Sequence, residues 1–277
     1  LDGKDAAFSA GNIGELYFDK VKDLSRNVLF IKPRTLLMLD TAVPSDQDAK
    51  VTLLYQTAEL EHIKAGNDVS NITKKGVTLN IMHLAPKAVE TKAVETPHYL
   101  YTLQRERHLK KEGMLTVSAS TKDKQPLVIA NLLTTDGSNG VSEVITEEGN
   151  GFVSGVASGK KFAFSTKPGH VYQTAGMETD AAAITWSDDR IFLALVSTFR
   201  SKDGSKVISS SSPVSLEISS EGIKYGSNAS AKLNISSSSK PKTVLLNGKA
   251  VSNFTYDNAK KQVSIQIAEG EGIIRIN

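Results

Sequence analysis

Short apolar runs separated by turn residues recur along the whole chain. Most are too short for a buried helix, and they are bounded by glycine, proline, asparagine or serine, which is the pattern of consecutive β-strands. The clearest runs occupy residues 28–31, 36–39, 51–56, 77–84 and 126–133. The last of these is apolar on both faces, so it predicts a strand in the centre of a sheet.

A strict two-residue alternation occurs at residues 115–120. Leu115, Val117 and Ala119 alternate with hydroxyl-bearing residues, so one face of this strand is expected in a core and the other in solvent. No helical pattern of three or more turns is present. The sequence therefore predicts an all-β protein, with a large antiparallel β-sandwich of the super-sandwich type followed by a small C-terminal β-sandwich.

The character of the sequence changes at the serine run that ends at Pro213. The apolar runs beyond it are shorter, and Asn247-Gly248 predicts a tight hairpin turn between two of them. We therefore expect a large domain over residues 1–212 and a small domain over residues 213–277.

The amino-acid composition and the net charge limit the kinds of molecule that this chain is expected to bind. Hydrophobic residues make up 39% of the chain, charged residues 23%, and the formal net charge is +3. Basic residues are scattered, which argues against nucleic-acid binding but is compatible with local attraction of a polyanion. No apolar run approaches the roughly 20 residues of a membrane-spanning helix. The chain has no cysteine, so thiol chemistry and disulfides are excluded.

The beginning of the sequence carries no start signal. It opens at Leu1, and the first methionine is Met38, inside a predicted strand. We therefore expect a fragment or a processed polypeptide.

Residues 26–57 resemble the heparinase II/III-like polysaccharide lyases. The residues that carry the resemblance are Arg26, Lys32-Pro33, Asp40 and Leu53-Leu54-Tyr55-Gln56-Thr57, with further similarity at residues 81–86 and 212–216. The resemblance covers most of the chain and identifies it with the C-terminal β-sandwich portion of that family. It implies β-elimination on an acidic, uronic-acid-containing polysaccharide such as a glycosaminoglycan, by a secreted or periplasmic bacterial protein.

The family also implies parts that this sequence does not contain. Its members carry an N-terminal α/α toroid ahead of the sandwich and a Tyr-His-x-His motif, so we expect this chain alone to be inactive and the toroid to be a partner. Some members hold zinc through a histidine at the position of Tyr55; with tyrosine there, we expect no metal, and we expect no other cofactor. No residue of this chain is assigned a catalytic role.

Candidate substrate-binding residues gather after residue 98. On a strand, Tyr99, Tyr101, Arg105 and Arg107 share one face, which would suit stacking on sugars and pairing with carboxylates; the alternative is a solvated sheet face. His83 is a further candidate, and the alternative for it is a histidine of the core.

Two other groups have weaker patterns. Glu59, Glu61 and His62 could bind a metal, but this spacing is common by chance. Asp40 follows an apolar run and is expected to cap the turn after a strand. Besides the lyase portion, two functions remain open: a non-catalytic carbohydrate-binding or structural β-sandwich module, and an adhesin-like scaffold.

Overall fold

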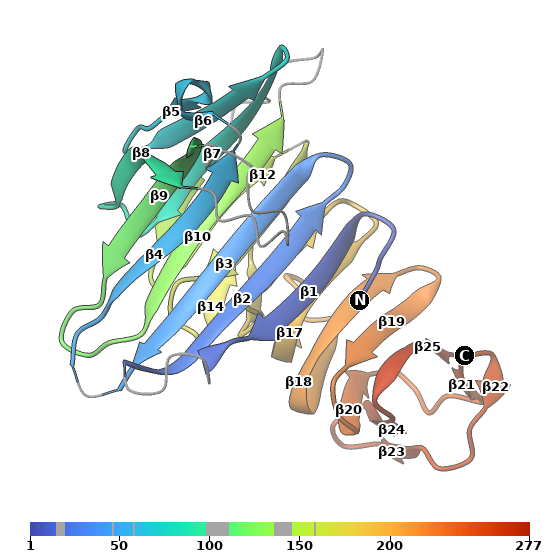
Figure 1. The fold of residues 1–277 in the computed structure, drawn as a ribbon. Helices are drawn as coiled ribbons and strands as arrows, with labels where there is room; N and C mark the ends of the chain where they lie inside the picture. The colour runs from blue at the N-terminus through green and yellow to red at the C-terminus, as the bar shows by residue number, and fades with distance from the viewer. Residues whose placement is uncertain (15–19, 46, 58, 98–110, 136–145, 158) are drawn as a thin grey trace, which may run out of the picture. The chain divides into compact units, whose positions relative to one another are not determined.

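The computed structural model describes residues 1–14, 20–45, 47–57, 59–97, 111–135, 146–157 and 159–277. In these residues the fold is built from antiparallel β-sheets with one short 3-10 turn (Figure 1). The predicted all-β class is confirmed. Among the described residues, no helix has the length and apolarity needed to cross a membrane.

The chain divides into two compact units. We call Ala10–Val28 with Arg34–Val141 the N-terminal unit, and Leu1–Ser9, Leu29–Pro33 and Ser142–Asn277 the C-terminal unit. Two strands, β1 and β2, contribute residues to both. The boundary predicted after residue 212 falls inside a strand, β18 (Val207–Ser219), and the division into domains at that point stays a prediction.

Most strands of the N-terminal unit belong to a sheet that has seven strands among the described residues (Figure 1). In spatial order these are β1 (Ala6–Asn12), β2 (Val21–Ile31), β3 (Thr35–Pro44), β10 (Leu127–Thr135), β7 (Val77–Ala85), β6 (Val69–Lys74) and β5 (Ile63–Lys64). Residues 127–134 of β10 are buried on both faces, between β3 and β7. The central strand predicted from residues 126–133 is therefore confirmed.

A second, smaller sheet covers part of the first. It runs in the order β4 (Lys50–Thr57), β9 (Lys111–Ser120), β8 (Glu90–Pro97), and the 3-10 turn η2 (Leu60–His62) lies near it. Apolar side chains of β4 and β9 share one core with those of β7 and β10. Leu115, Val117 and Ala119 are buried in it, as their alternation predicts. This core makes the N-terminal unit a sandwich of two sheets.

The C-terminal unit contains the remaining described strands, in one branched antiparallel sheet. They are β11 (Thr146–Gly149), β12 (Phe152–Ala157), β13 (Lys160–Ser165), β14 (Tyr172–Thr174), β15 (Met177–Thr179), β16 (Ala183–Trp186), β17 (Ile191–Arg200), β18 (Val207–Ser219), β19 (Gly222–Ser227), β20 (Ala231–Ser236), β21 (Val244–Leu246), β22 (Lys249–Ala250), β23 (Thr255–Asp257), β24 (Gln262–Ile267) and β25 (Gly270–Ile276).

One apolar core runs through this unit, from β13 to β25. It includes the fully buried Leu193 of β17 and Leu216 of β18, which are partners across the ladder. The hairpin predicted at Asn247-Gly248 joins β21 to β22. Both turn residues have positive φ, 53° and 78°, as a type I′ turn requires.

Candidate functional site

The structure describes only one of the predicted substrate-binding residues. Tyr99, Tyr101, Arg105 and Arg107 fall within residues 98–110, outside the described part of the chain, so their role stays a prediction. His83 lies on β7 and is 9% exposed. That burial matches the alternative of a core histidine, while its substrate-binding role also stays a prediction.

Both ring nitrogens of His83 have partners. Nδ1 lies 2.7 Å from the Asn131 Oδ1 of β10, and Nε2 lies 3.0 Å from the Ser70 Oγ of β6. Because the amide oxygen can only accept, Nδ1 carries a proton and donates it to Asn131. The single hydroxyl proton of Ser70 can go either to Nε2 or to the Gly66 carbonyl oxygen, which lies 3.1 Å from the same Oγ. Burial lowers the pKa of His83, and the Asn131 hydrogen bond and the charge of Asp68 oppose it. At neutral pH the His83 imidazole is therefore uncharged, and both of its nitrogens lie within hydrogen-bond distance of a neighbour.

Asp40 does not cap a turn, and the prediction that it does is wrong. The strand β3 continues past it to Pro44, because residues 41–44 still alternate in burial and Thr41 and Ala42 pair with β10. The Asp40 carboxylate is 5% exposed and accepts a hydrogen bond from Arg26 Nε at 2.7 Å. Burial raises the pKa of Asp40 despite the neighbouring guanidinium.

These residues form a line across the sheet, which we call the inner polar row: Arg26, Asp40, Asn131, His83 and Ser70. They lie on β2, β3, β10, β7 and β6, which are consecutive neighbours. The row faces the smaller sheet, because Asp40 pairs with Ile129, whose side chain is in the core shared by the two sheets. Polar side chains at that depth need partners.

The row has a gap in its middle. Three buried atoms there have no hydrogen-bond partner among the described residues: Asp40 Oδ2, Asn131 Nδ2 and the hydroxyl of Tyr55. Tyr55 belongs to β4 in the opposite sheet. Burial raises its pKa above the usual range, the charge of Asp40 raises it further, and Arg26 acts the other way. Tyr55 therefore lies near enough to Asp40 and Arg26 for their charges to act on its hydroxyl.

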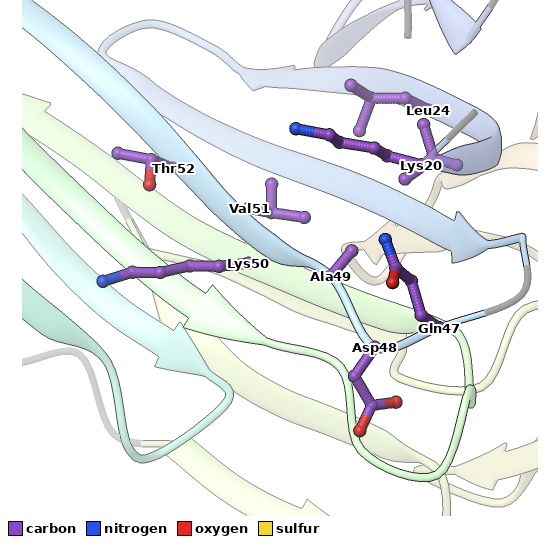
Figure 2. Close-up of a pocket in the computed structure, with 9 residues that line it drawn as sticks. Lys20, Leu24, Gln47, Asp48, Ala49, Lys50, Val51 and Thr52 are labelled. Carbon is purple, nitrogen blue, oxygen red and sulfur yellow. The ribbon is translucent and has the colours of Figure 1, made fainter. Parts of the chain in front are cut away.

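A groove of about 350 Å³ opens beside β4, where the smaller sheet ends (Figure 2). We call it the edge groove. It is lined by Lys20, Val21, Leu24, Gln47, Asp48, Ala49, Lys50, Val51 and Thr52. They come from the start of β2 and the residue before it in one sheet, and from the first residues of β4 and the loop before it in the other. Its volume lies at the lower end of the range for small-ligand sites.

The charged residues that line the edge groove are two lysines, Lys20 and Lys50, and one aspartate, Asp48. The exposed amine of Lys20 has no ion-pair partner among the described residues, whereas Lys50 pairs with Glu90 at 2.7 Å. Glu90 also pairs with Lys92, and the hydrogen bond from Lys50 is the main reason that its pKa falls to about 2. The Asp48 carboxylate accepts the backbone N–H of Lys124 at 2.8 Å. Cationic groups with an apolar floor suit an anionic sugar chain.

Glu59, Glu61 and His62 bring their ligand atoms within 4.8 Å of one another. His62 Nε2 is already 3.2 Å from a Glu59 carboxylate oxygen. Three ligands are one fewer than a closed structural zinc site takes, so the geometry agrees with a local ion pair as well as with a metal.

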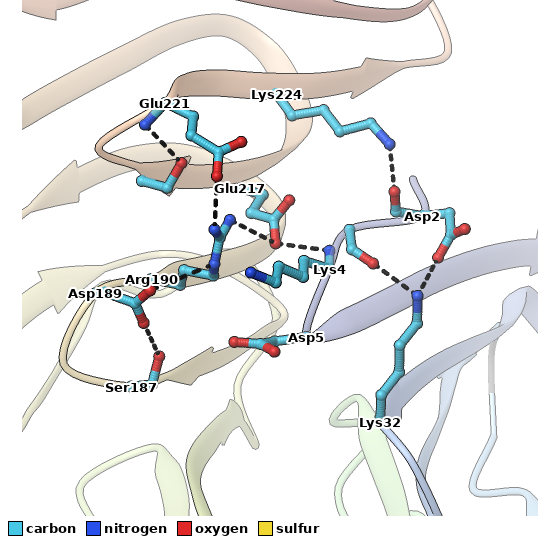
Figure 3. A network of polar contacts seen from close by, with 12 residues as sticks. Asp2, Lys4, Asp5, Lys32, Ser187, Asp189, Arg190, Glu217, Glu221 and Lys224 are labelled. Atoms are coloured by element: carbon cyan, nitrogen blue, oxygen red, sulfur yellow. Dashed lines mark hydrogen bonds and ion pairs between the residues drawn. The ribbon is translucent and has the colours of Figure 1, made fainter.

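A second charged cluster lies in the C-terminal unit (Figure 3). Lys32 binds the Asp2 carboxylate at 2.6 Å, Lys160 binds that of Asp5 at 2.8 Å, and Glu217 Oε1 accepts the backbone N–H of Lys4 at 2.8 Å. In the same cluster Arg190 contacts Asp189, Glu217 and Glu221, and Lys224 contacts Asp2 and Glu271. The cavity beside it measures about 10 Å³, room for about one water molecule. Paired charges around so small a space indicate a structural role.

No family model matches this chain, and no curated protein matches it either. The inner polar row and the edge groove are therefore interpreted from their own chemistry.

The stability of the N-terminal unit is expected to depend on pH through His83. Its folded pKa is lowered, so the unfolded state binds more protons below the ordinary value of about 6.5. The contribution of His83 to the free energy of unfolding should be fully present above that value, and it should be lost as the pH falls below it. Chemical unfolding between about pH 8 and about pH 5 measures this dependence.

Two variants control the experiment. His83→Gln should flatten the pH dependence over that interval, whereas His170→Gln, at an exposed position, should leave it unchanged. Equal pH dependence in wild type and His83→Gln would contradict the assignment.

Proposed function

We propose that this chain is the β-sandwich region of a polysaccharide lyase-like protein that acts on uronic-acid-containing polysaccharide by β-elimination. In this proposal the protein is secreted or periplasmic, an α/α toroid supplies most of the catalytic groups, and the sandwiches alone bind glycan without cleaving it. The observation that carries the proposal is the edge groove, because Lys20, whose amine has no ion-pair partner among the described residues, lines it beside the apolar side chains of Val21, Leu24 and Val51. The resemblance of residues 26–57 supports the choice of polymer.

Binding to an acidic oligosaccharide tests the proposal. A chain with both Lys20→Ala and Lys50→Ala should bind an oligouronate at least about tenfold more weakly than wild type, because one charge-assisted hydrogen bond of about 1.5–3 kcal/mol exceeds the 1.4 kcal/mol of a tenfold change. Isothermal titration calorimetry measures the affinity.

The matched control removes the same charge elsewhere. Lys240 and Lys260 are exposed lysines of the C-terminal unit, and their double alanine variant should bind as wild type. Equal weakening in both double variants would mean that net charge, rather than the groove, attracts the glycan.

A non-catalytic carbohydrate-binding module is the second candidate. It is favoured by the state of the inner groups, because burial raises the pKa of Tyr55 and holds His83 neutral between two partners. The Tyr55 hydroxyl therefore stays protonated and cannot act as a base, and both ring nitrogens of His83 already lie within hydrogen-bond distance of Asn131 and Ser70. Ultraviolet detection of unsaturated product should show no turnover by this chain, and appreciable turnover would contradict both proposals.

The two candidates differ in what accompanies the chain. Amphipathic helices of a toroid, encoded directly upstream of Leu1, would decide for the lyase, and an unrelated upstream sequence would decide for the module.

A further inference from the structure

Arg26 is an oriented donor at the outer end of the inner polar row. Its Nε donates to Asp40 Oδ1 at 2.7 Å. The Asp40 side chain is 5% exposed, whereas that of Arg26 is 46% exposed. No described residue accepts a hydrogen bond from the two terminal nitrogens of Arg26. The buried carboxylate therefore fixes one edge of the guanidinium and leaves the other two nitrogens available.

The position of Arg26 continues the edge groove. Leu24 lines the groove, and Arg26 follows it two residues later on β2, so the two side chains share a face about 7 Å apart. On the opposite sheet, Val51 lines the groove and Tyr55 lies farther along the same face of β4. The charges of Asp40 and Arg26 both act on the Tyr55 hydroxyl, so Tyr55 lies near the two on the facing sheet. The edge groove thus lies beside Arg26 on the same face of β2.

The second oxygen of Asp40 gives an independent indication of its role. Asp40 Oδ2 is buried without a partner in the described chain, so Arg26 is the side chain that this carboxylate holds. A buried carboxylate is costly unless it is paired. The arrangement therefore commits Asp40 to orienting Arg26.

We infer that Arg26 binds the carboxylate of a uronic acid residue seated in the edge groove, and that Asp40 acts as its positioning residue. Two terminal guanidinium nitrogens match the two oxygens of a planar carboxylate. Lys20, which lines the groove without an ion-pair partner among the described residues, is then available to a neighbouring anionic residue of the same sugar chain. This inference rests on the proposed function and adds the group that selects a carboxylated sugar.

The test compares an oligouronate with its carboxyl-reduced, neutral counterpart. Wild type should prefer the oligouronate, and Arg26→Lys should reduce that preference about tenfold, because lysine keeps the charge and loses the paired geometry. Arg34→Lys, at an exposed arginine of the same unit, is the matched control and should bind as wild type. An Arg26→Lys chain with the wild-type preference would overturn the inference.

Asp40→Asn separates positioning from a general structural role. It should lower the preference for the carboxylated ligand about as much as Arg26→Lys while its binding of the neutral ligand stays at the wild-type level. A parallel loss for both ligands would overturn the positioning role. The Nε–H resonance of Arg26 provides a readout within the wild-type fold, and it should shift when D-glucuronate is added and stay in place with D-glucose.

The outcomes distinguish this inference from the function on which it rests. If the Lys20 and Lys50 variant loses oligouronate binding and Arg26→Lys does not, the function stands and the role of Arg26 is overturned. If glucuronate shifts the Arg26 resonance and no oligouronate binds, the carboxylate site stands and the proposed function is overturned. If neither ligand has an effect, both are overturned.

Discussion

Replacing Phe199 with alanine should lower the free energy of unfolding of the C-terminal unit by about 3–5 kcal/mol, the usual cost of removing a buried aromatic ring. Phe199 lies on β17 and is 2% exposed, within the main core of the unit. It pairs with Ile208 of β18 on one side and Thr179 of β15 on the other. Three strands therefore fix the walls around it, and the cavity has little freedom to collapse.

Urea unfolding of Phe199→Ala measures this cost, and a matched control separates core packing from loss of apolar surface in general. Val171→Ala, at a position that is 54% exposed, should change the free energy of unfolding by less than about 0.5 kcal/mol. A loss below about 1 kcal/mol for Phe199→Ala would mean that the core around it repacks.

Gly113→Ala should be costly in the N-terminal unit for a steric reason. Gly113 lies on β9, opposite Thr57 of β4 and Glu95 of β8. A Cβ at this position would lie 2.5 Å from Leu60 Cα and 2.6 Å from Glu59 O. These are backbone atoms that cannot rotate away, so the turn η2 or the strand must move. Overpacking of this kind typically costs about 1–3 kcal/mol.

A glycine with free space around it is the control for Gly113→Ala. Gly11, also on a strand, has no atom within 4 Å of an added Cβ, and Gly11→Ala should be neutral or slightly stabilising. Unfolding curves and amide hydrogen exchange at Leu60–His62 measure both variants. An equal free energy of unfolding for the two variants would show that η2 can move away from the added methyl group without loss of stability.

Much of the fold follows from local pattern. The alternation at Leu115, Val117 and Ala119 predicts the face of β9 that is buried, and Asn247-Gly248 predicts its hairpin, because both depend on neighbouring residues only. Ser118 departs from its alternation and is buried. Its hydroxyl lies 2.9 Å from that of Thr52 across the ladder, a contact set by strand pairing that the local pattern does not contain.

The candidate site could not be read from local pattern for the same reason. The error at Asp40 arose because an apolar run stops there while the strand continues, and the partner that makes a buried carboxylate tolerable, Arg26, lies on another strand. The edge groove combines Lys20 with Lys50, which no spacing rule connects. Signals of this kind appear only once the pairing of strands is known.

The charged cluster of the C-terminal unit has a consequence for the order of events during synthesis. Residues 2–5 bind partners as distant as Glu217 and Lys224, so these contacts close loops of more than 200 residues, from Lys4 to Glu217. Because a chain is made from its N-terminus, this segment leaves the ribosome long before β18 and β19 exist. These two contacts therefore form only after β18 and β19 have been made, whereas the ion pair of Asp2 with Lys32 joins residues of the first part of the chain.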